Sequence, residues 1–319
     1  MRWAGTVGLL LGVAACASAD HSQAPSVDAA AAPVDTALPA FVLEATTSLV
    51  PGPGLALRTN LPARDLECRE LPVRDAPCGD VDGDLLTDAW EDLVLDRMRP
   101  MLRLDEDEPI VTDGGTISAV GRVALRTGGA ALDVVMFVMN GYAQDYGSCG
   151  ASAHHGDSER VGLRLRGIAG GGPGDVEVVA AYTAAHEYTA NDRGKVFSEQ
   201  GLSQLVFAFD PTTQQPRWVV FPSEAKHATY ATIAECEGAV PFPCLTEDCA
   251  PDGVADATLF DRLPPVVNAG EDNARRIDAL DAHGFAGETA WGEHSFCGGM
   301  GGTGCSASVR EKLLSDPFQ

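Results

Sequence analysis

Basic residues are scarce in this chain. Its 319 residues include 22 Lys and Arg against 46 Asp and Glu, which gives a formal net charge of -24. Nucleic-acid binding needs clustered Lys and Arg, so this balance argues against a nucleic-acid partner. Such a surface favours cations, calcium in particular, although acidity can also serve solubility alone.

Several motifs of catalysis and metal binding are also missing. A G-x-S-x-G elbow or an H-E-x-x-H helix would have favoured an enzyme, and neither is present. The glycine run 298–302 is not a phosphate loop, because no Lys-Ser/Thr follows it. The sequence is compatible with a catalytic triad, because the members of a triad can lie far apart in the chain.

The longest apolar run near the start, Val7 to Val13, is too short to span a bilayer. Residues 1–19 are therefore predicted to be an export signal. Val13-Ala14-Ala15-Cys16 is similar to a bacterial lipobox and favours lipidation of Cys16, which would anchor the chain to a membrane. The alternative is cleavage after Ala17-Ser18-Ala19. Both place the protein outside the cytoplasm, as an outer-membrane or cell-surface lipoprotein or a secreted protein.

Cysteine usage agrees with export. Apart from Cys16, the 9 cysteines leave an even set of eight, which suggests disulfides. Pairs of cysteines that are near in sequence, such as Cys68–Cys78 and Cys297–Cys305, are plausible disulfides. Zinc is the alternative for the group Cys236, Cys244 and Cys249, but no C-x2-C pair supports it.

An acidic run at 80–91 is the clearest local signal. Its carboxylates fall at positions 1, 3, 5, 9 and 12 of a twelve-residue window: Asp80, Asp82, Asp84, Asp88 and Glu91. This is the spacing of an EF-hand-type calcium loop. Position 6 is Leu85, where that loop usually has glycine, and no helix signal precedes it. We therefore predict a structural calcium clamp rather than a sensor, with chance acidity before a helix start as the alternative.

Periodicity predicts a mainly β fold. An apolar stripe over 88–101 indicates one helix, which Pro100 should end or kink. Strand-like segments follow at 116–125, 132–139, 161–166, 176–186, 205–209 and 217–221. Gly and Pro turns between strands, with no intervening helical repeat, indicate an antiparallel β-sandwich.

The expected parts follow from these segments and from composition. Residues 20–45 are rich in Ala, Pro, Ser and Asp, which predicts a disordered linker. After it we expect a calcium loop and helix (46–104), the β-sandwich core (105–235) and a disulfide-rich, Cys/Gly-rich C-terminal extension (236–319).

Three His-bearing segments lie next to acidic residues at predicted strand ends. The first is His154-x-Gly156-Asp157-x-Glu159, the second ends at His186, and the third contains Glu224, Lys226 and His227. These side chains suit a divalent cation or a carboxylate–His acid/base pair if the strand ends meet on one rim. Polar groups that only satisfy buried hydrogen bonds are the alternative.

The order of these motifs resembles a family of exported bacterial proteins that look like the vacuolar-protein-sorting-associated family. The matching motifs lie between about 90 and 305 and include Leu104 to Pro109, His154 to Glu159, Ala185-His186, Glu224 to Tyr230 with Cys236, Asn268 to Glu271, and Phe296 to Gly299.

A more distant resemblance is to necrosis-inducing, NLP-type cytolysins, whose G-H-R-H-D-W-E motif has the same His, Asp and Glu spacing. Those are β-sandwiches with a divalent cation in an acidic pocket, and they act on membrane sphingolipids. The resemblance implies that Asp145, His154, Asp157 and Glu159 are metal ligands. Gly156 and Ser158 replace the motif's second His and its Trp, so a metal pocket is expected without toxicity.

Together these patterns predict an exported, lipid-anchored envelope protein that binds calcium and a second divalent cation. We expect it to contact a carbohydrate or lipid headgroup, with His186, Glu224, Lys226 and His227 shaping the ligand site. A metal-dependent hydrolase, with Glu224 or His227 as base or acid and Lys226 steadying charge, is one alternative. A purely structural envelope protein is the other.

Overall fold

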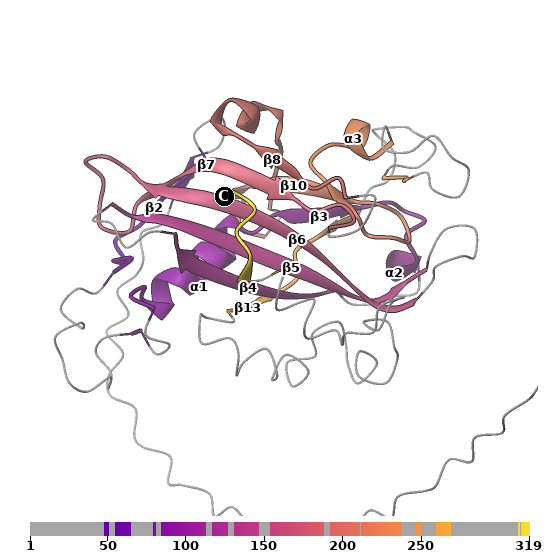
Figure 1. Ribbon diagram of the computed structural model, residues 1–319, viewed down its shortest axis with the longest axis horizontal. Coiled ribbons are helices and arrows are strands. Elements are labelled where there is room, and N and C mark those ends of the chain that lie inside the picture. The colour runs from indigo at the N-terminus through magenta and orange to yellow at the C-terminus, as the bar shows by residue number, and fades with distance from the viewer. Residues whose placement is uncertain are drawn as a thin grey trace, which may run out of the picture. The chain divides into compact units, whose positions relative to one another are not determined.

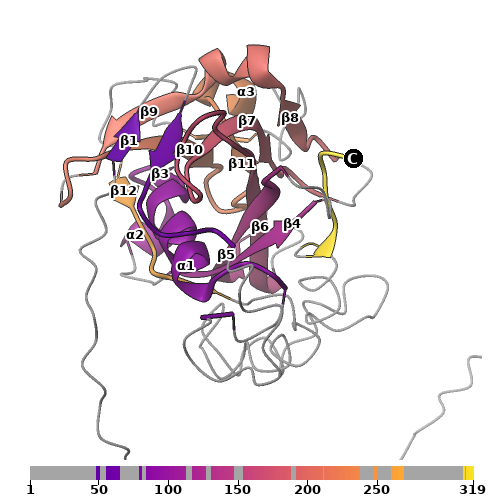
Figure 2. The same cartoon turned by 90° about the vertical axis from the view of Figure 1, so that its left-hand side faces the viewer.

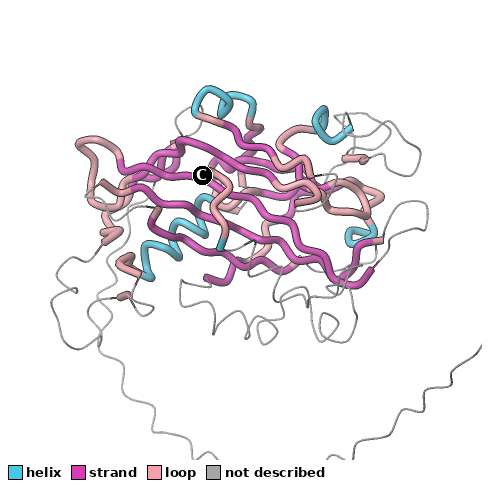
Figure 3. The backbone as a smooth tube through the Cα atoms, in the orientation of Figure 1, coloured by secondary structure: helices cyan, strands magenta, loops and turns pink. Residues whose placement is uncertain are grey.

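Strands make up most of the regular structure in the computed structural model of this chain (Figures 1 and 3). The structure describes residues 48–50, 55–64, 79–80, 84–112, 117–126, 131–146, 154–187, 192–210, 212–237, 247–249, 260–268, 312 and 314–319. The prediction of a mainly β protein is confirmed. The expected signal, Cys16 and the linker lie outside the described residues.

The larger sheet is curled and contains eight strands within the described residues (Figure 2). In order they are β1 (Ser48–Val50), β2 (Ala56–Arg58), β7 (Val176–Thr183), β6 (His154–Gly167), β5 (Asp133–Asp145), β4 (Ser118–Leu125) and β13 (Val266–Asn268), with β8 (Lys195–Phe197) paired to β7. Strands β4, β5 and β6 follow one another in the chain and pair antiparallel.

A smaller sheet has five strands within the described residues. They are β11 (Thr229–Tyr230), β10 (Pro216–Pro222), β3 (Met101–Leu104) and β12 (Phe260–Arg262), with β9 (Val206–Phe209) paired to β10. Purely antiparallel pairing is wrong for two pairs, because β3–β10 and β4–β13 are parallel. Each joins strands far apart in the chain, and the long connection between them allows the parallel direction.

Helix α1 (Asp88–Met98) packs against strands of both sheets (Figure 2). The helix ends before Pro100, as predicted, and β3 begins at Met101, directly after this proline. Trp90 and Leu95 of α1 are buried in one core that also includes residues of β6 and β10. The helix approaches β4 closely at Gly121, where any side chain would collide with Leu95.

Strand β6 starts earlier than its apolar alternation indicates. The prediction begins at Val161, whereas the strand begins at His154 and pairs with β5 along its length. Val161, Leu163 and Leu165 face the core, in agreement with the alternation. The polar motif 154–159 is therefore part of the strand itself, and it leads directly into the candidate site. Three short helices complete the described structure: α2 (Pro109–Thr112), η2 (Glu199–Gln204) and α3 (Ile233–Glu237).

Candidate functional site

His227 lies in a buried polar cluster beside the paired ends of β5 and β6, and its side chain has no exposed surface. Nδ1 is 3.1 Å from Asp157 Oδ2, and Nε2 is 3.3 Å from Glu108 Oε1. The ring of Tyr142 stacks on the imidazole at 3.8 Å between centroids, with 2° between the planes. Because both nitrogens face carboxylates, both can donate only if the ring is a doubly protonated imidazolium.

The electrostatics of the cluster favour this charged form. Burial lowers the pKa of His227, but hydrogen bonds and Coulomb attraction from Asp157 and Glu108 outweigh it and raise the pKa to about 9. The ring is therefore positively charged at neutral pH. It forms a buried triad of one cation between two carboxylates, closed on one side by an aromatic ring.

The segment that carries His227, residues 223–228, has an unusual backbone. Ala225 and His227 adopt φ values of 62° and 60°, a left-handed region that costs such residues about 1–3 kcal/mol. Backbone contacts hold this conformation. The amide of Ala225 donates to Glu108 Oε2 at 2.8 Å, and its carbonyl accepts from the amide of Tyr146 at 2.8 Å. Glu108 thus fixes both the backbone and the imidazole of this segment.

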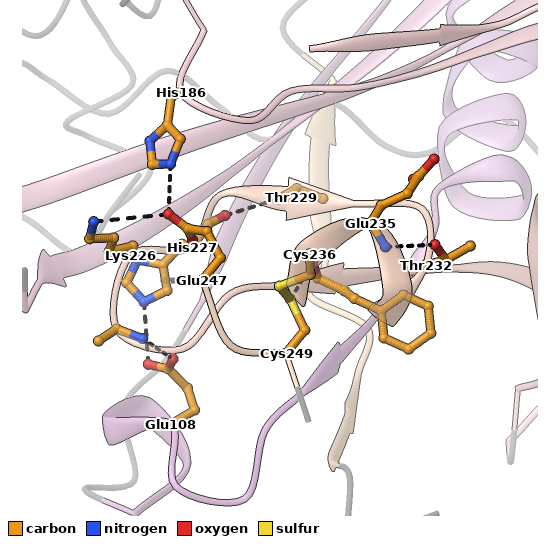
Figure 4. Close-up of a disulfide and its surroundings, with 12 residues drawn as sticks. Glu108, His186, Lys226, His227, Thr229, Thr232, Glu235, Cys236, Glu247 and Cys249 are labelled. Atoms are coloured by element: carbon orange, nitrogen blue, oxygen red, sulfur yellow. Dashed lines mark hydrogen bonds and ion pairs between the residues drawn. A yellow bond between two sulfur atoms is a disulfide. The ribbon is translucent and has the colours of Figure 1, made fainter. Parts of the chain in front are cut away.

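A second group of charges adjoins the first (Figure 4). Glu247, with a side chain only 1% exposed, lies 2.8 Å from His186 Nε2 and 3.9 Å from Lys226 Nζ. Burial raises the pKa of Glu247, but the hydrogen bond to His186 contributes to holding that pKa below its ordinary value. His186 also has a positive φ, 57°. Segments around 186, 226 and 247 therefore meet through one buried carboxylate.

The disulfide Cys236–Cys249 fixes the segment that carries Glu247 (Figure 4). Both cysteines are fully buried. This pairing contradicts the zinc alternative for Cys236 and Cys249, since a disulfide sulfur is not a thiolate ligand. The predicted pairs Cys68–Cys78 and Cys297–Cys305 lie outside the described residues.

Replacing both disulfide cysteines, as Cys236→Ser/Cys249→Ser, is expected to lower the free energy of unfolding by about 2 kcal/mol. The bond closes a short loop, with a sequence separation of 13, so the effect falls at the low end of the usual range. Urea unfolding of the oxidised chain, the reduced chain and the variant measures it. Equal midpoints for all three would contradict the structural role of this bond.

The neighbouring residues of β6 extend the buried network. Burial, with contributions from Asp157 and Glu187, raises the pKa of Glu159 well above its ordinary value, although Lys312 opposes the shift. Glu159 Oε2 has no hydrogen-bond partner within the described residues. Arg160 is buried against Glu187, a residue adjoining His186. The cluster is thus a polar interior at the strand ends.

The structure places the expected metal ligands on one pair of strands. Asp145 lies opposite His154, and Asp157 and Glu159 follow on β6, both buried. The side chain of His154 is outside the described part. Asp157 is hydrogen-bonded to His227, and within the described residues no group of three or more His, Cys, Asp or Glu is arranged to hold a metal ion.

The structure describes the calcium-loop window only in part, because residues 81–83, which include Asp82, lie outside the described residues. The carboxylate of Asp80 accepts the amides of Asp84 and Leu85 at 3.2 and 3.1 Å, and Asp84 Oδ1 accepts the amide of Leu86 at 2.7 Å. Leu85 has a φ of 78°, and Glu91 on α1 is fully buried. Asp88 begins the helix.

Sequence reasoning missed three members of the site. Glu108 stands in an acidic run that looks solvent-exposed, Tyr142 continues an apolar strand, and Glu247 follows a segment with no clear periodicity. Only Glu247 has a local signal, its closeness to Cys249. The positions of the other two depend on contacts with His227, about 80 to 120 residues away in the chain.

No family model, curated protein or solved structure matches this chain. Among the described residues, no helix is both long and apolar enough to cross a membrane.

Proposed function

We propose that this chain is an exported, calcium-binding protein of the cell envelope that binds a lipid headgroup or a carbohydrate. Lipidation of Cys16 would hold it at a membrane. In this proposal the two sheets form a sandwich-like scaffold around a common core, and the resident calcium lies in the loop 80–91. His186, Glu224 and Lys226 contribute to the ligand side.

The conformation of Leu85 carries the calcium part of the proposal. It occupies position 6 of the window, where calcium loops make a sharp turn and usually place glycine. A leucine with a φ of 78° costs about 1–3 kcal/mol of conformational energy. The loop therefore makes the same sharp turn although it has leucine, and not glycine, at this position. The hydrogen bonds to Asp80 draw the backbone around this carboxylate, as expected at position 1 of a calcium loop.

Glu91 supports the same interpretation from the other end of the window. Position 12 supplies the glutamate that closes the shell of a calcium ion, and Glu91 has no exposed surface there. Bound calcium would fasten the start of α1 to the loop before it.

Calorimetric titration with calcium tests this part. Asp80→Ala/Asp84→Ala is expected to abolish one binding event, while Asp92→Ala/Glu199→Ala removes the same charge from exposed positions and should leave that event intact. At about 100 times the dissociation constant, calcium should stabilise the wild type by about 2.7 kcal/mol. A wild type without binding heat or thermal shift would contradict the proposal.

A second divalent cation at Asp145, His154, Asp157 and Glu159 remains part of the proposal. Such an ion would compete with His227 for Asp157, so binding should weaken when His227 is protonated. The same titration on Asp157→Ala/Glu159→Ala decides it. The second site is supported if this variant loses a cation-binding event that is separate from binding at the loop 80–91. Unchanged heats of cation binding argue against it.

The exposed side of the site is where a ligand would be contacted. His227 is closed off, whereas His186, Glu224 and Lys226 keep part of their surfaces accessible. We therefore assign His227 to holding the segment in shape and its neighbours to contact with a headgroup or sugar.

One observation favours a metal-dependent hydrolase as a second candidate. Burial, together with nearby carboxylates that include Asp105 and Asp248, raises the pKa of Glu224, and its side chain is partly exposed. A carboxyl group with a raised pKa can act as a general acid. This candidate requires turnover of a phosphoester or glycan substrate by the wild type and its loss in Glu224→Gln, with calcium binding unchanged.

A further inference from the structure

A cavity of about 370 Å³ opens beside the charged group formed by His186, Lys226 and Glu247. Its lining comes from β7, β8, β11, α3 and the turn before β8: Thr183, Arg193, Lys195, Tyr230, Ala234 and Glu235. The volume is at the small end of the range for small-molecule sites, which suits one sugar ring or one headgroup rather than a long chain. Arg193 and Tyr230 are not members of the buried triad of His227, Asp157 and Glu108.

Arg193 distinguishes this cavity in a strongly acidic protein. Among the arginine side chains that the structure describes, most have a carboxylate partner, such as Arg58 with Asp175 and Arg217 with Asp210. Arg193 is exposed and has no such ion pair among the described residues. Its backbone amide donates to the carbonyl of Ala185 at 2.8 Å, which holds its place next to His186.

The other cation of the lining is already compensated. Lys195 forms an ion pair with Glu235, so these two charges cancel within the cavity. The lining therefore has a net charge of about plus one, carried by Arg193. A guanidinium with five donors in a planar fork matches the two oxygens of a carboxylate, sulfate or phosphate group.

Tyr230 supplies a second donor in the same lining. The residue is 5% exposed, and its hydroxyl has no hydrogen-bond partner within the described residues. Burial, with a contribution from Glu247, raises the pKa of Tyr230 above its ordinary value, so the hydroxyl keeps its proton. A buried donor without a partner is costly, and an acceptor on a ligand would relieve that cost.

We propose that this cavity binds a small oxyanion group, a carboxylate, sulfate or phosphate, carried by a sugar or a lipid headgroup. The inference deepens the proposed function and rests on it for the kind of ligand. Arg193 pairs with the anion, and the hydroxyl of Tyr230 donates to it or to the adjoining polar atom. The net charge of -24 selects against polyanions, because repulsion grows with each added charge of the ligand.

Calorimetry on the full chain tests the cavity, with inorganic phosphate, glucuronate and glycerol 3-phosphate as probes. Arg193→Ala is expected to weaken binding by about tenfold or more, the usual loss for a charged hydrogen bond, and Tyr230→Phe by a smaller factor. Arg166→Ala is the matched control: its side chain is 51% exposed and pairs with Glu177, and its binding should equal the wild type's.

The probes also separate the sources of the ligand. Preference for glucuronate indicates a glycan, and preference for glycerol 3-phosphate indicates a lipid headgroup. The inference is overturned if no probe binds the wild type, or if Arg193→Ala binds as the wild type does. Calcium titration of the same samples keeps the two proposals apart: retained calcium binding with no anion binding rejects the cavity alone, and the reverse rejects the calcium loop alone.

Discussion

Arg160→Ala should lower the free energy of unfolding by about 3–5 kcal/mol, the usual loss when one partner of a buried ion pair is removed. The side chains of Arg160 and Glu187 are only 1% and 4% exposed, and they form a direct ion pair. The guanidinium also lies over the rings of Phe137 and Tyr182, at 4.9 and 5.3 Å from their centroids. Truncation would leave Glu187 as an uncompensated buried charge in an emptied space.

The same guanidinium holds the end of the chain against β6. It donates to the carbonyl of Lys312, and to the carbonyl and hydroxyl of Ser315 at 2.7 and 3.1 Å. Lys312 in turn donates to the carbonyl of Ser158 at 2.6 Å. Arg160→Ala should therefore also expose the segment from Lys312 onward to carboxypeptidase, and we expect the enzyme to remove these residues faster from the variant than from the wild type.

Arg164→Ala is the matched control, four residues along the same strand. Its guanidinium pairs with Asp133 at 2.9 Å, but the two side chains are 37% and 19% exposed. Pairs of this kind contribute about 0–1 kcal/mol. Urea unfolding of both variants measures the contrast. If the two substitutions lower the free energy of unfolding by the same amount, burial does not explain how much the Arg160–Glu187 pair contributes to stability.

The sequence predicts those parts of the fold that depend on local pattern. Alternation of apolar residues identifies β6, and Pro100 identifies the end of α1, because each follows from the geometry of neighbouring residues. The parallel pairs β3–β10 and β4–β13 leave no such mark. Their partners are more than 100 residues apart, and pairing at that separation depends on the packing of the whole chain.

The residues of the candidate site also fall into two groups, those that a local sequence pattern indicates and those that only tertiary packing brings together. Asp157 and His227 are noticeable in the sequence because each belongs to a His-bearing segment with acidic neighbours at a predicted strand end, and the structure joins them directly. Glu108, the second carboxylate that contacts His227, is hidden in the run 105–108, where four consecutive acidic residues look like a solvated turn. Burial decides which member of that run matters, and burial is a tertiary property: Glu108 is 1% exposed, whereas Asp107 is exposed.

The buried triad should make the protein less stable as the pH rises from about 6.5 through about 9. The folded-state pKa of His227, about 9, is above the ordinary value of 6.5. A group with a raised pKa contributes its full stabilisation below the unfolded-state value and loses it as the pH passes the folded-state value. At about 1.4 kcal/mol per pKa unit, the loss is about 3 kcal/mol for a fully buried group.

His227→Asn isolates this contribution. Asparagine tolerates the left-handed backbone that His227 adopts, and it does not titrate. Urea unfolding midpoints from pH 6 to pH 10 should fall steeply for the wild type and much less for the variant. Glu159, whose pKa is also raised, adds a decrease of the same sign that begins near its ordinary value. The charge of His227 lowers the pKa of Glu159, so this decrease is larger in the variant, which lacks that charge.

The comparison of the two curves also tests what His227 does in the site. If its charge holds Asp157 and Glu108 in place, the variant should be less stable than the wild type at pH 6, and the gap should narrow by pH 10. Parallel curves would mean that folding does not raise the pKa of His227, so the ring would be mostly neutral above about pH 6.5 and the two carboxylates would then need another cation. A divalent ion at Asp157 is the arrangement that such a result would favour, and calcium added at pH 10 would then stabilise the wild type more than Asp157→Ala.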